Sequence, residues 1–433
     1  MEQSLEALQS GKLKGAKSLK LACGLTKFPE EIIDLADTLE FLDLSDNDLT
    51  TLPNSIAELK KLKILFFARN QFTEFPVILK NCPALTMIGF KSNQLTAVPE
   101  NAFPPKLQWL VLTDNNITAI PKSIGSCNLL EKFLIAGNQL TELPDELANC
   151  QNLGLLRIAD NNLDTLPDWL FKLPKISWVA FGGNPVFKRT ETTNNLKSFS
   201  WEDFTINELI GEGASGLISK ATWNTKNQDI ALKIFKGNVT SDGLPEDEMA
   251  VSIAAGAHKN LIPVLGKIKN HPENKSGLIL ELISPDYINL GNPPSLDTCT
   301  RDVFDKDTVF SSTAFLSIAK SMASVAKQLH SKGINHGDFY AHNILINKSA
   351  TSLLGDFGAA SFYDVNSPLA HNIQRVEVGA FGCLLEDVLA LVPKDQLATD
   401  LESKWQSIIF NCKNPIVASR MSFEEILVEL EEL

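Results

Sequence analysis

Apolar residues return at a fixed interval through the first half of the chain, and an Asn returns with them. The interval between successive Asn positions is 22 or 23 residues, and a Pro from Pro53 to Pro167 keeps the same period. Each unit carries an L-x-x-L-x-L stretch before the Asn and an L-P-x-x-[IL] stretch after it. One such unit cannot bury its own apolar face, so the pattern predicts stacked copies of a short strand, a turn and a return segment. The Asn positions are Asn47, Asn70, Asn93, Asn115, Asn138, Asn161 and Asn184.

These units resemble leucine-rich repeats of the short type, as in LEFLDLSDNDLTTLPNSIAELKK and LGLLRIADNNLDTLPDWLFKLPK. The resemblance covers residues 19–187 and implies an α/β leucine-rich-repeat solenoid, with residues 1–18 as its N-terminal cap. We expect the repeat Asn to hydrogen-bond the backbone of the turn rather than to act in chemistry. Three cysteines share a core slot with Leu59 and Leu173, so we expect them to be buried: Cys82, Cys127 and Cys150.

Outward-pointing strand positions of the repeats are largely apolar. In a strand the side chains alternate between faces, so the positions between the Leu residues leave the core. Contiguous exposed apolar surface usually marks a binding site, and we expect a protein substrate or partner to bind this concave face. The alternatives are that these positions are apolar by chance or that the second half of the chain covers them. The face comprises Phe41, Ile64, Phe66, Met87, Trp109, Leu134 and Trp178.

The repeat pattern stops after Asn184, and residues 188–200 are polar and predict a linker. A stack of repeats needs a cap at each end, and no cap sequence follows the last copy. The linker or the next domain must therefore cover the apolar residues Ile176, Val179 and Phe181.

The second half holds several motifs with chemical meaning. LIGEGASGLI (209–218) contains a G-x-G-x-x-G pattern, which is weak evidence by itself. Lys233 follows in the strand-like stretch IALKIF, and the next predicted helix offers Glu248, or else Glu246, as a carboxylate partner. HGDFYAHN (336–343) and GDFG (355–358) then supply hard oxygen ligands of the kind that Mg²⁺ prefers.

Together with EVGAFGCLLEDVL (377–389) and CKNPIVASRMSFEEIL (412–427), these motifs resemble the protein kinase fold over residues 201–433. The resemblance implies a bilobal α+β domain that uses ATP and Mg²⁺. Asp338 would orient the acceptor hydroxyl, Lys233 would pair with Glu248 and the α/β-phosphates, and the metal ligands would be Asn343 and Asp356. The implied nucleotide contacts are Gly211, Gly213, Gly216, Ile218, Ala231, Lys233, Leu280, Glu281, Ile283 and Leu345.

Three features depart from the kinase pattern. Gly337 stands where an Arg usually receives an activation-loop phosphate, and the stretch from Asp356 to Glu377 is short and lacks an A-P-E motif. Arg420 therefore lacks its usual partner, and we expect it to pair with Glu377 instead. Tyr340 replaces the Lys that is typical of serine/threonine kinases, and His342 lies where many tyrosine kinases carry Arg. We expect an enzyme that is not switched by activation-loop phosphorylation.

The sequence thus predicts an ATP-dependent protein kinase, with Ser/Thr favoured over Tyr as acceptor and with repeats that recruit a substrate or partner. A non-catalytic pseudokinase scaffold is one alternative. The other is a small-molecule phosphotransferase of the aminoglycoside or choline kinase type, because H-G-D-x-x-x-x-N without A-P-E also resembles those enzymes.

Charge and composition limit the kinds of partner and compartment that we expect. Residues 1–197 carry 20 basic and 22 acidic side chains, so almost all of the net charge of −13 lies in the second half. No basic face is expected, which argues against nucleic acid as a partner. No apolar stretch is long enough to span a bilayer, and the N-terminus lacks the apolar core of a secretory signal. The seven cysteines form no C-x-x-C pair, which predicts a reducing, cytoplasmic location.

Overall fold

The structure is a computed structural model that describes residues 3–187, 196–213, 215–237, 239–240 and 242–433. It divides into two compact units, Met1–Leu173 and Pro174–Leu433. The division falls before the last repeat copy, which therefore belongs to the second unit. Of the predicted linker 188–200, residues 188–195 lie outside the described part of the chain.

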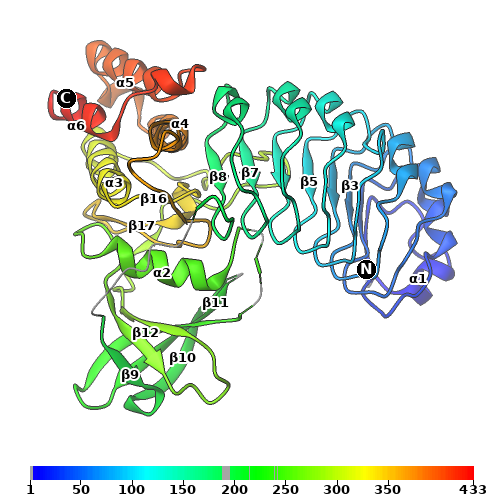
Figure 1. Cartoon of the computed structure of the whole chain (residues 1–433), viewed down its shortest axis with the longest axis horizontal. Coiled ribbons are helices and arrows are strands. Elements are labelled where there is room, and N and C mark those ends of the chain that lie inside the picture. Colours follow the sequence, from blue (N-terminus) through cyan, green and yellow to red (C-terminus); the bar gives the residue numbers. More distant parts are fainter. Residues whose placement is uncertain (1–2, 188–195, 214, 238, 241) are drawn as a thin grey trace. The chain divides into compact units, whose positions relative to one another are not determined.

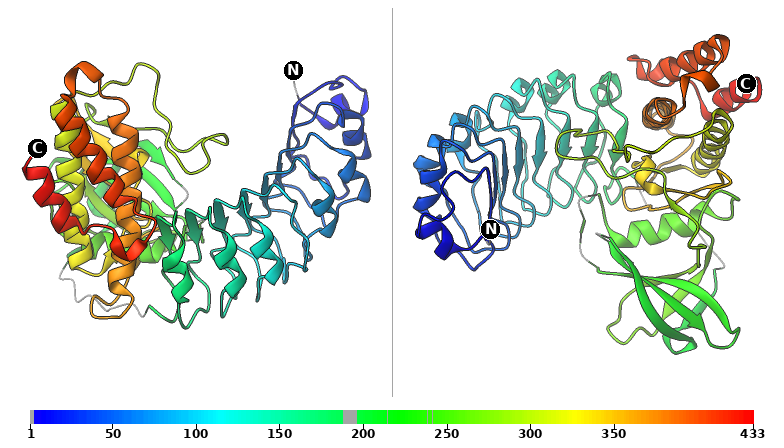
Figure 2. Two further views of the ribbon diagram at one scale, coloured as in Figure 1. Left: turned by 90° about the horizontal axis from the view of Figure 1, so that it is seen from above. Right: turned by 180° about the vertical axis from the view of Figure 1, so that it is seen from behind.

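The first unit is a leucine-rich-repeat stack, as the sequence predicts. Helix α1 (Leu5–Gln9) begins at Ser4, whose side chain accepts a hydrogen bond from the Ala7 N–H at 3.2 Å. Seven short strands follow and pair in parallel, each residue facing its counterpart in the next copy (Figures 1 and 2). They are β1 (Ser18–Lys20), β2 (Phe41–Asp43), β3 (Ile64–Phe66), β4 (Met87–Gly89), β5 (Trp109–Val111), β6 (Lys132–Leu134) and β7 (Leu155–Arg157). The return segments form short 3₁₀-helices at Glu30–Leu35, Asn54–Glu58, Val77–Asn81, Lys122–Ser126, Asp145–Asn149 and Asp168–Lys172.

The repeat Asn residues have the structural role that the sequence predicts. Asn47 accepts the Leu25 N–H at 2.9 Å and donates to the carbonyls of Leu21 at 2.8 Å and Leu44 at 2.9 Å. One side chain thus ties the turn to the preceding copy and satisfies backbone groups that would otherwise be buried without partners.

The repeat cysteines are also core residues, as expected. Burial raises the pKa of the Cys82 and Cys150 thiols to about 11 and that of Cys127 to about 12. The three thiols are therefore protonated at neutral pH, and their chemical reactivity is low.

The predicted apolar face is only partly accessible. Phe41, Ile64, Phe66 and Trp109 are half-buried. The expectation of exposure is wrong for three other members, because only a few per cent of each side chain is exposed: Met87, Leu134 and Trp178.

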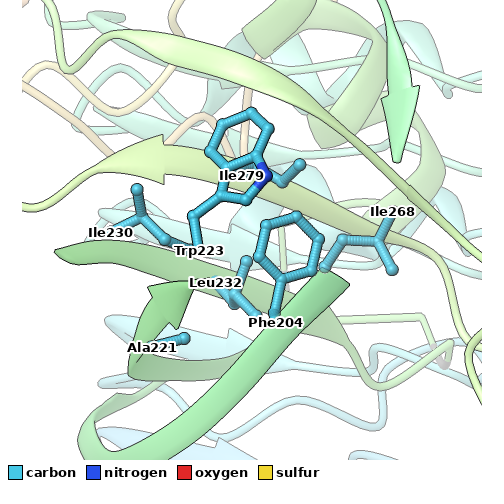
Figure 3. Packing of buried hydrophobic residues seen from close by; sticks show 7 residues of the cluster. All are labelled: Phe204, Ala221, Trp223, Ile230, Leu232, Ile268 and Ile279. Atoms are coloured by element: carbon cyan, nitrogen blue, oxygen red, sulfur yellow. The ribbon is translucent and has the colours of Figure 1, made fainter. Parts of the chain in front are cut away.

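The amino-terminal lobe of the second unit is a six-stranded sheet with the order β10-β11-β12-β14-β13-β9. Its strands are β9 (Ser198–Ser200), β10 (Phe204–Glu212), β11 (Gly216–Trp223), β12 (Gln228–Phe235), β13 (Val264–Lys269) and β14 (Gly277–Glu281). Trp223 and Phe204 centre the buried cluster that Figure 3 shows, and the sheet residues around them complete it. Helix α2 (Pro245–Ala255) completes this lobe (Figure 1).

The carboxy-terminal lobe is mainly helical, and its orange and red helices gather together in Figure 2. Its helices are α3 (Ser312–Ser331), α4 (Ala370–Leu389), α5 (Thr399–Cys412) and α6 (Phe423–Glu431). Ser422 and Glu425 form a capping box that begins α6. Its short strands are β15 (Ile288–Asn289), β16 (Ile334–Asn335), β17 (Ile344–Ile346), β18 (Ser352–Leu354) and β19 (Ser361–Phe362). Short 3₁₀-helices of this unit lie at Trp201–Asp203, Ala341–Asn343, Lys394–Gln396 and Val417–Ser419.

The last repeat copy packs within this second unit. Its strand β8 (Trp178–Ala180) lies against helix α4. The residues that required a cover are buried, with exposed fractions of 0% for Ile176, 4% for Val179 and 2% for Phe181. Phe187 contributes by packing its ring 4.3 Å from that of Phe181.

Candidate active site

The first part of the site is a buried ion pair between the sheet and helix α2. Lys233 of β12 donates to the Oε1 atom of Glu248, whose side chain is only 3% exposed. Burial raises the pKa of Glu248, and the positive charge of Lys233 opposes that effect. Glu246, the alternative that the sequence left open, is exposed. The structure therefore brings Glu248, not Glu246, to Lys233.

Helix α2 is held in place at its carboxyl end. The Nζ atom of Lys332 donates to the carbonyls of Ala254 at 3.2 Å and Ala255 at 2.7 Å, and Gln328 donates to Ala255 at 2.9 Å. These donors satisfy carbonyls that a helix end leaves without partners inside the helix. Gln328 lies in α3 and Lys332 is the C-cap residue of the same helix, so the helix that carries Glu248 is anchored to the carboxy-terminal lobe.

The second part of the site is the loop between β16 and β17. The Asn343 amide donates to the side chain of Asp338 at 2.7 Å and to its carbonyl at 2.9 Å. The amide oxygen of Asn343 therefore faces away from Asp338. The Gly355 N–H donates to the Asn343 carbonyl at 3.0 Å, which places Asp356 directly beside this loop.

Asp356 itself has a left-handed backbone, with φ of +50°. Its side chain accepts the Gly358 N–H at 3.1 Å. A non-glycine residue in this conformation is uncommon and is often found at functional sites. A carboxylate and an amide oxygen on adjacent loops form a donor set that suits Mg²⁺.

His342 lies between Asp338 and a second carboxylate, Asp302, which the sequence did not predict. Its Nδ1 atom lies 2.7 Å from Asp302 Oδ1, and its Nε2 atom lies 3.9 Å from Asp338 Oδ2. Burial opposes the charged ring, but the hydrogen bond with Asp302 and the charge of Asp338 outweigh it, so the pKa of His342 is raised. Asp302 also accepts the Ala341 N–H at 2.5 Å. Sequence reasoning missed Asp302 because it belongs to no motif and lies 40 residues from His342.

A cavity of about 150 Å³ lies between the glycine-containing strands, α2 and Asp356. It encloses less space than a typical site for a whole small ligand, for which roughly 300 Å³ is the lower end. Of the predicted site residues, its lining includes Gly213, Gly216, Ile218, Lys233, Glu248, Leu280 and Asp356. The sequence missed the lining residues Ser215, Ser252, Ile262, Val264, Leu278, Gly355 and Phe357.

The other predicted residues lie outside that lining. Ala231 pairs with Leu280 across β12 and β14, and Gly211 pairs with Ile218 across β10 and β11. Leu345 lies on β17, opposite Leu353. Four more complete this group: Glu281, Ile283, Asp338 and Asn343.

The predicted pair between Arg420 and Glu377 is wrong. Glu377 accepts the Gly337 N–H at 2.8 Å and lies 2.7 Å from the His330 Nε2 atom. Arg420 instead donates to backbone carbonyls, including those of Ile176 at 2.8 Å and Pro174 at 3.0 Å. Burial lowers the pKa of Arg420 to about 10. Carbonyl groups of the last repeat copy therefore accept hydrogen bonds from Arg420, in place of the Glu of the missing A-P-E motif.

The fold and this group of side chains define the second unit as a protein kinase domain. Comparison with family models agrees, because the protein kinase domain model matches residues 204–379. Leucine-rich-repeat models match residues 38–59 and 83–140. The chain therefore combines leucine-rich repeats with a protein kinase domain, as the sequence predicts.

Curated relatives that are named as kinases are similar to part of the chain. A probable LIM domain-containing serine/threonine-protein kinase of Dictyostelium discoideum is 25% identical over 55% of this chain and 40% of its own length. A serine/threonine-protein kinase of Saccharomyces cerevisiae is 30% identical over 39% of this chain and 15% of its own. A probable L-type lectin-domain containing receptor kinase of Arabidopsis thaliana is 28% identical over 51% of this chain and 32% of its own length. The chain thus spans less than half the length of each of these relatives.

Within the described residues, no helix combines the length and apolar character that a membrane crossing requires.

Proposed function

We propose that this protein is an ATP-dependent protein kinase that favours Ser and Thr over Tyr as acceptor. The observation that carries the proposal is the buried Lys233–Glu248 ion pair in the same unit as the hydrogen-bonded Asp338 and Asn343. A protein kinase needs such a pair to place the phosphates and such an aspartate to receive the hydroxyl proton. The serine/threonine kinases among the relatives support the preferred acceptor.

ATP with Mg²⁺ is the cofactor that fits these residues. Lys233 would hold the α/β-phosphates, and the metal would be held by the amide oxygen of Asn343 and the carboxylate of Asp356. When bound, Mg²⁺ neutralises the charge of the phosphates. Asp338 orients the acceptor hydroxyl and takes up its proton.

We propose that the nucleotide binds in a cleft of which the cavity beside Lys233 forms one end. The Gly211, Gly213 and Gly216 backbone would lie over the phosphates. Adenine would lie among the apolar side chains of Ile218, Ala231 and Leu345. The backbone of Glu281 and Ile283, which follow Leu280 in the chain, would hydrogen-bond its edge.

The repeats, in this proposal, recruit a protein substrate or partner through the accessible part of the apolar face. Aromatic side chains are common anchors of protein interfaces. The rings of Phe41 and Phe66 lie 5.9 Å apart, and the Lys132 Nζ atom lies 4.5 Å from the centre of the Trp109 ring. The residues that we retain for binding are Phe41, Ile64, Phe66 and Trp109.

We also propose the cytoplasm as the compartment. All seven cysteines are free thiols, as is usual in a reducing environment.

A non-catalytic scaffold is a second candidate, which the small volume of the cavity beside Lys233 favours. One experiment separates the candidates. The full chain is incubated with labelled ATP and Mg²⁺ beside an Asp338→Asn variant. Label on protein that depends on Asp338 supports the kinase. Label on small metabolites from added extract indicates a small-molecule phosphotransferase, and label nowhere indicates the scaffold.

A further inference from the structure

The last repeat copy, residues 174–187, contacts the catalytic loop through backbone atoms. The side-chain amide of Asn335 donates to the Val179 carbonyl at 2.9 Å. Gly337 has φ of +73°, and a Cβ atom there would lie 2.9 Å from the Val179 oxygen and 2.6 Å from the Ala359 oxygen. No larger residue fits between those two carbonyls without displacing backbone. Gly337 therefore accommodates the repeat at the place where kinases usually carry Arg.

A column of rings then connects the same copy to the catalytic aspartate. The rings of Trp178 and Tyr340 are stacked with centroids 4.6 Å apart and an interplanar angle of 2°. Tyr340 in turn stacks on His342, with centroids 5.1 Å apart. The far edge of His342 lies 3.9 Å from Asp338 Oδ2. Trp178 and Tyr340 are 3% and 4% exposed, so these two rings are enclosed by protein.

The copy also reaches the segment that follows Asp356. The Ser361 hydroxyl accepts the N–H groups of Phe181 at 3.1 Å and Gly182 at 2.9 Å. A Cβ atom at Gly182 would lie 3.5 Å from an oxygen of Asp247, the neighbour of Glu248 in α2. Residues 174–187 thus contact the catalytic loop and the segment after Asp356, and Gly182 lies near Asp247 of the helix of the ion pair.

We propose that residues 174–187 are a positioning element of the kinase site, in which Trp178 sets the position of Asp338 through Tyr340 and His342. The inference rests on the proposed kinase function and deepens it. In kinases with a long activation segment, phosphorylation orders that segment through new contacts with Arg side chains. In this chain the segment is short, and the last repeat copy contacts the catalytic loop instead. Trp178 is accordingly a positioning residue and not part of a partner-binding face.

Removal of the Trp178 ring should lower the rate of transfer more than the binding of nucleotide. Misplacement of a reacting group by about 1 Å can cost roughly a hundredfold in rate. In full-length Trp178→Leu we expect kcat at saturating ATP and Mg²⁺ to fall about tenfold to a hundredfold. Since Trp178 does not line the cavity beside Lys233, the KM for ATP should stay within about twofold. Trp178→Phe keeps a stacking ring and should recover most of kcat.

Trp169→Leu is the matched control, because Trp169 is a tryptophan of the first unit that hydrogen-bonds Asp145. It should leave both kinetic constants unchanged. Wild-type kcat in Trp178→Leu would overturn the proposal. So would equal losses in Trp178→Leu and Trp178→Phe, or a parallel loss in Trp169→Leu.

Amide hydrogen exchange tests the same inference without activity. Exchange at the N–H groups of Gly337, Ala341 and Asn343 should be at least about tenfold faster in Trp178→Leu than in wild type, because local opening becomes easier. Unchanged exchange there contradicts the proposal. A wild-type chain that transfers no more label than Asp338→Asn contradicts the kinase function instead, so the two failures are distinguishable.

Discussion

At the scale of single residues, Gly337 is determined by its contacts with the last repeat copy and with Glu377. Its N–H donates to Glu377, its φ is positive, and its Cα faces the carbonyls of Val179 and Ala359. The close packing at this position therefore excludes Arg, in addition to removing a contact with an activation-loop phosphate. The sequence indicated the lost phosphate contact. It could not predict the packing, because Val179 lies far from Gly337 along the chain.

Gly337→Arg, which restores the usual kinase residue, should therefore damage this protein. A non-glycine residue in the left-handed region costs roughly 1–2 kcal/mol, and overpacking costs about 1–3 kcal/mol more. We expect the free energy of unfolding of the second unit to fall by about 2–5 kcal/mol, measured by urea denaturation. Gly337→Ala should show a smaller loss of the same sign. An unchanged midpoint in Gly337→Arg would contradict the packing argument.

Glu377 should make the stability of the kinase unit sensitive to acid. Burial would raise the pKa of Glu377, but the hydrogen bond and charge of His330 outweigh burial, so the folded pKa lies below the unfolded one. A lowered carboxyl pKa contributes stability above the unfolded pKa of about 4.3, and this contribution is lost as pH falls through the folded pKa.

Glu377→Gln removes this titration. At pH 7 the variant should be less stable by about 3 kcal/mol, because it breaks a buried pair. Below about pH 4 the difference from wild type should shrink. Thermal unfolding across pH 3–7 measures both effects. A constant difference over that range would show that Glu377 does not carry the pH dependence.

At the scale of elements, the sequence predicted those structures whose signals are periodic or local. The repeat strands follow a period of 22 or 23 residues, and the kinase motifs lie on the expected strands and loops. It missed β9 (Ser198–Ser200), which pairs in parallel with β13 from inside the predicted linker. A three-residue strand with two serines has no apolar alternation, so its pairing depends on a distant partner.

Helix α2 offers a prediction at this scale, because its carboxyl end is anchored by Gln328 of α3 and by Lys332, the C-cap residue of α3. The double variant Gln328→Leu/Lys332→Met should destabilise the helix end by about 1–2 kcal/mol, since each lost hydrogen bond is worth about 1 kcal/mol. Amide exchange in the last turn of α2 should rise accordingly. Lys327→Met is the control on α3, because Lys327 pairs with the exposed Glu424 at 3.1 Å and such surface pairs contribute little stability. Equal exchange in both variants would exclude the anchor.

For the whole molecule, Trp109 and Trp178 show a limit of reading repeats from sequence. Both occupy the same strand position, so the period makes them equivalent and predicts one shared face. The structure assigns them to different units, and only Trp178 is enclosed, by Tyr340. Deletion of residues 1–187 would remove both and could not separate recruitment from catalysis, since the contacts of Val179 and Trp178 would also be lost.

Point variants in the first unit separate the two roles. Phe66→Ala/Trp109→Ala should leave ATP turnover and autophosphorylation at wild-type rates, because neither residue belongs to the kinase unit. If the apolar face recruits the substrate, labelling of the protein substrate in a cell extract should fall about tenfold or more, as for loss of an interface anchor worth about 2 kcal/mol. Lys61→Ala, a change at an exposed lysine of the repeats, is the control and should leave labelling unchanged. Wild-type labelling by the double variant would remove Phe66 and Trp109 from substrate recognition. A fall in autophosphorylation would instead show that this part of the repeats also serves catalysis.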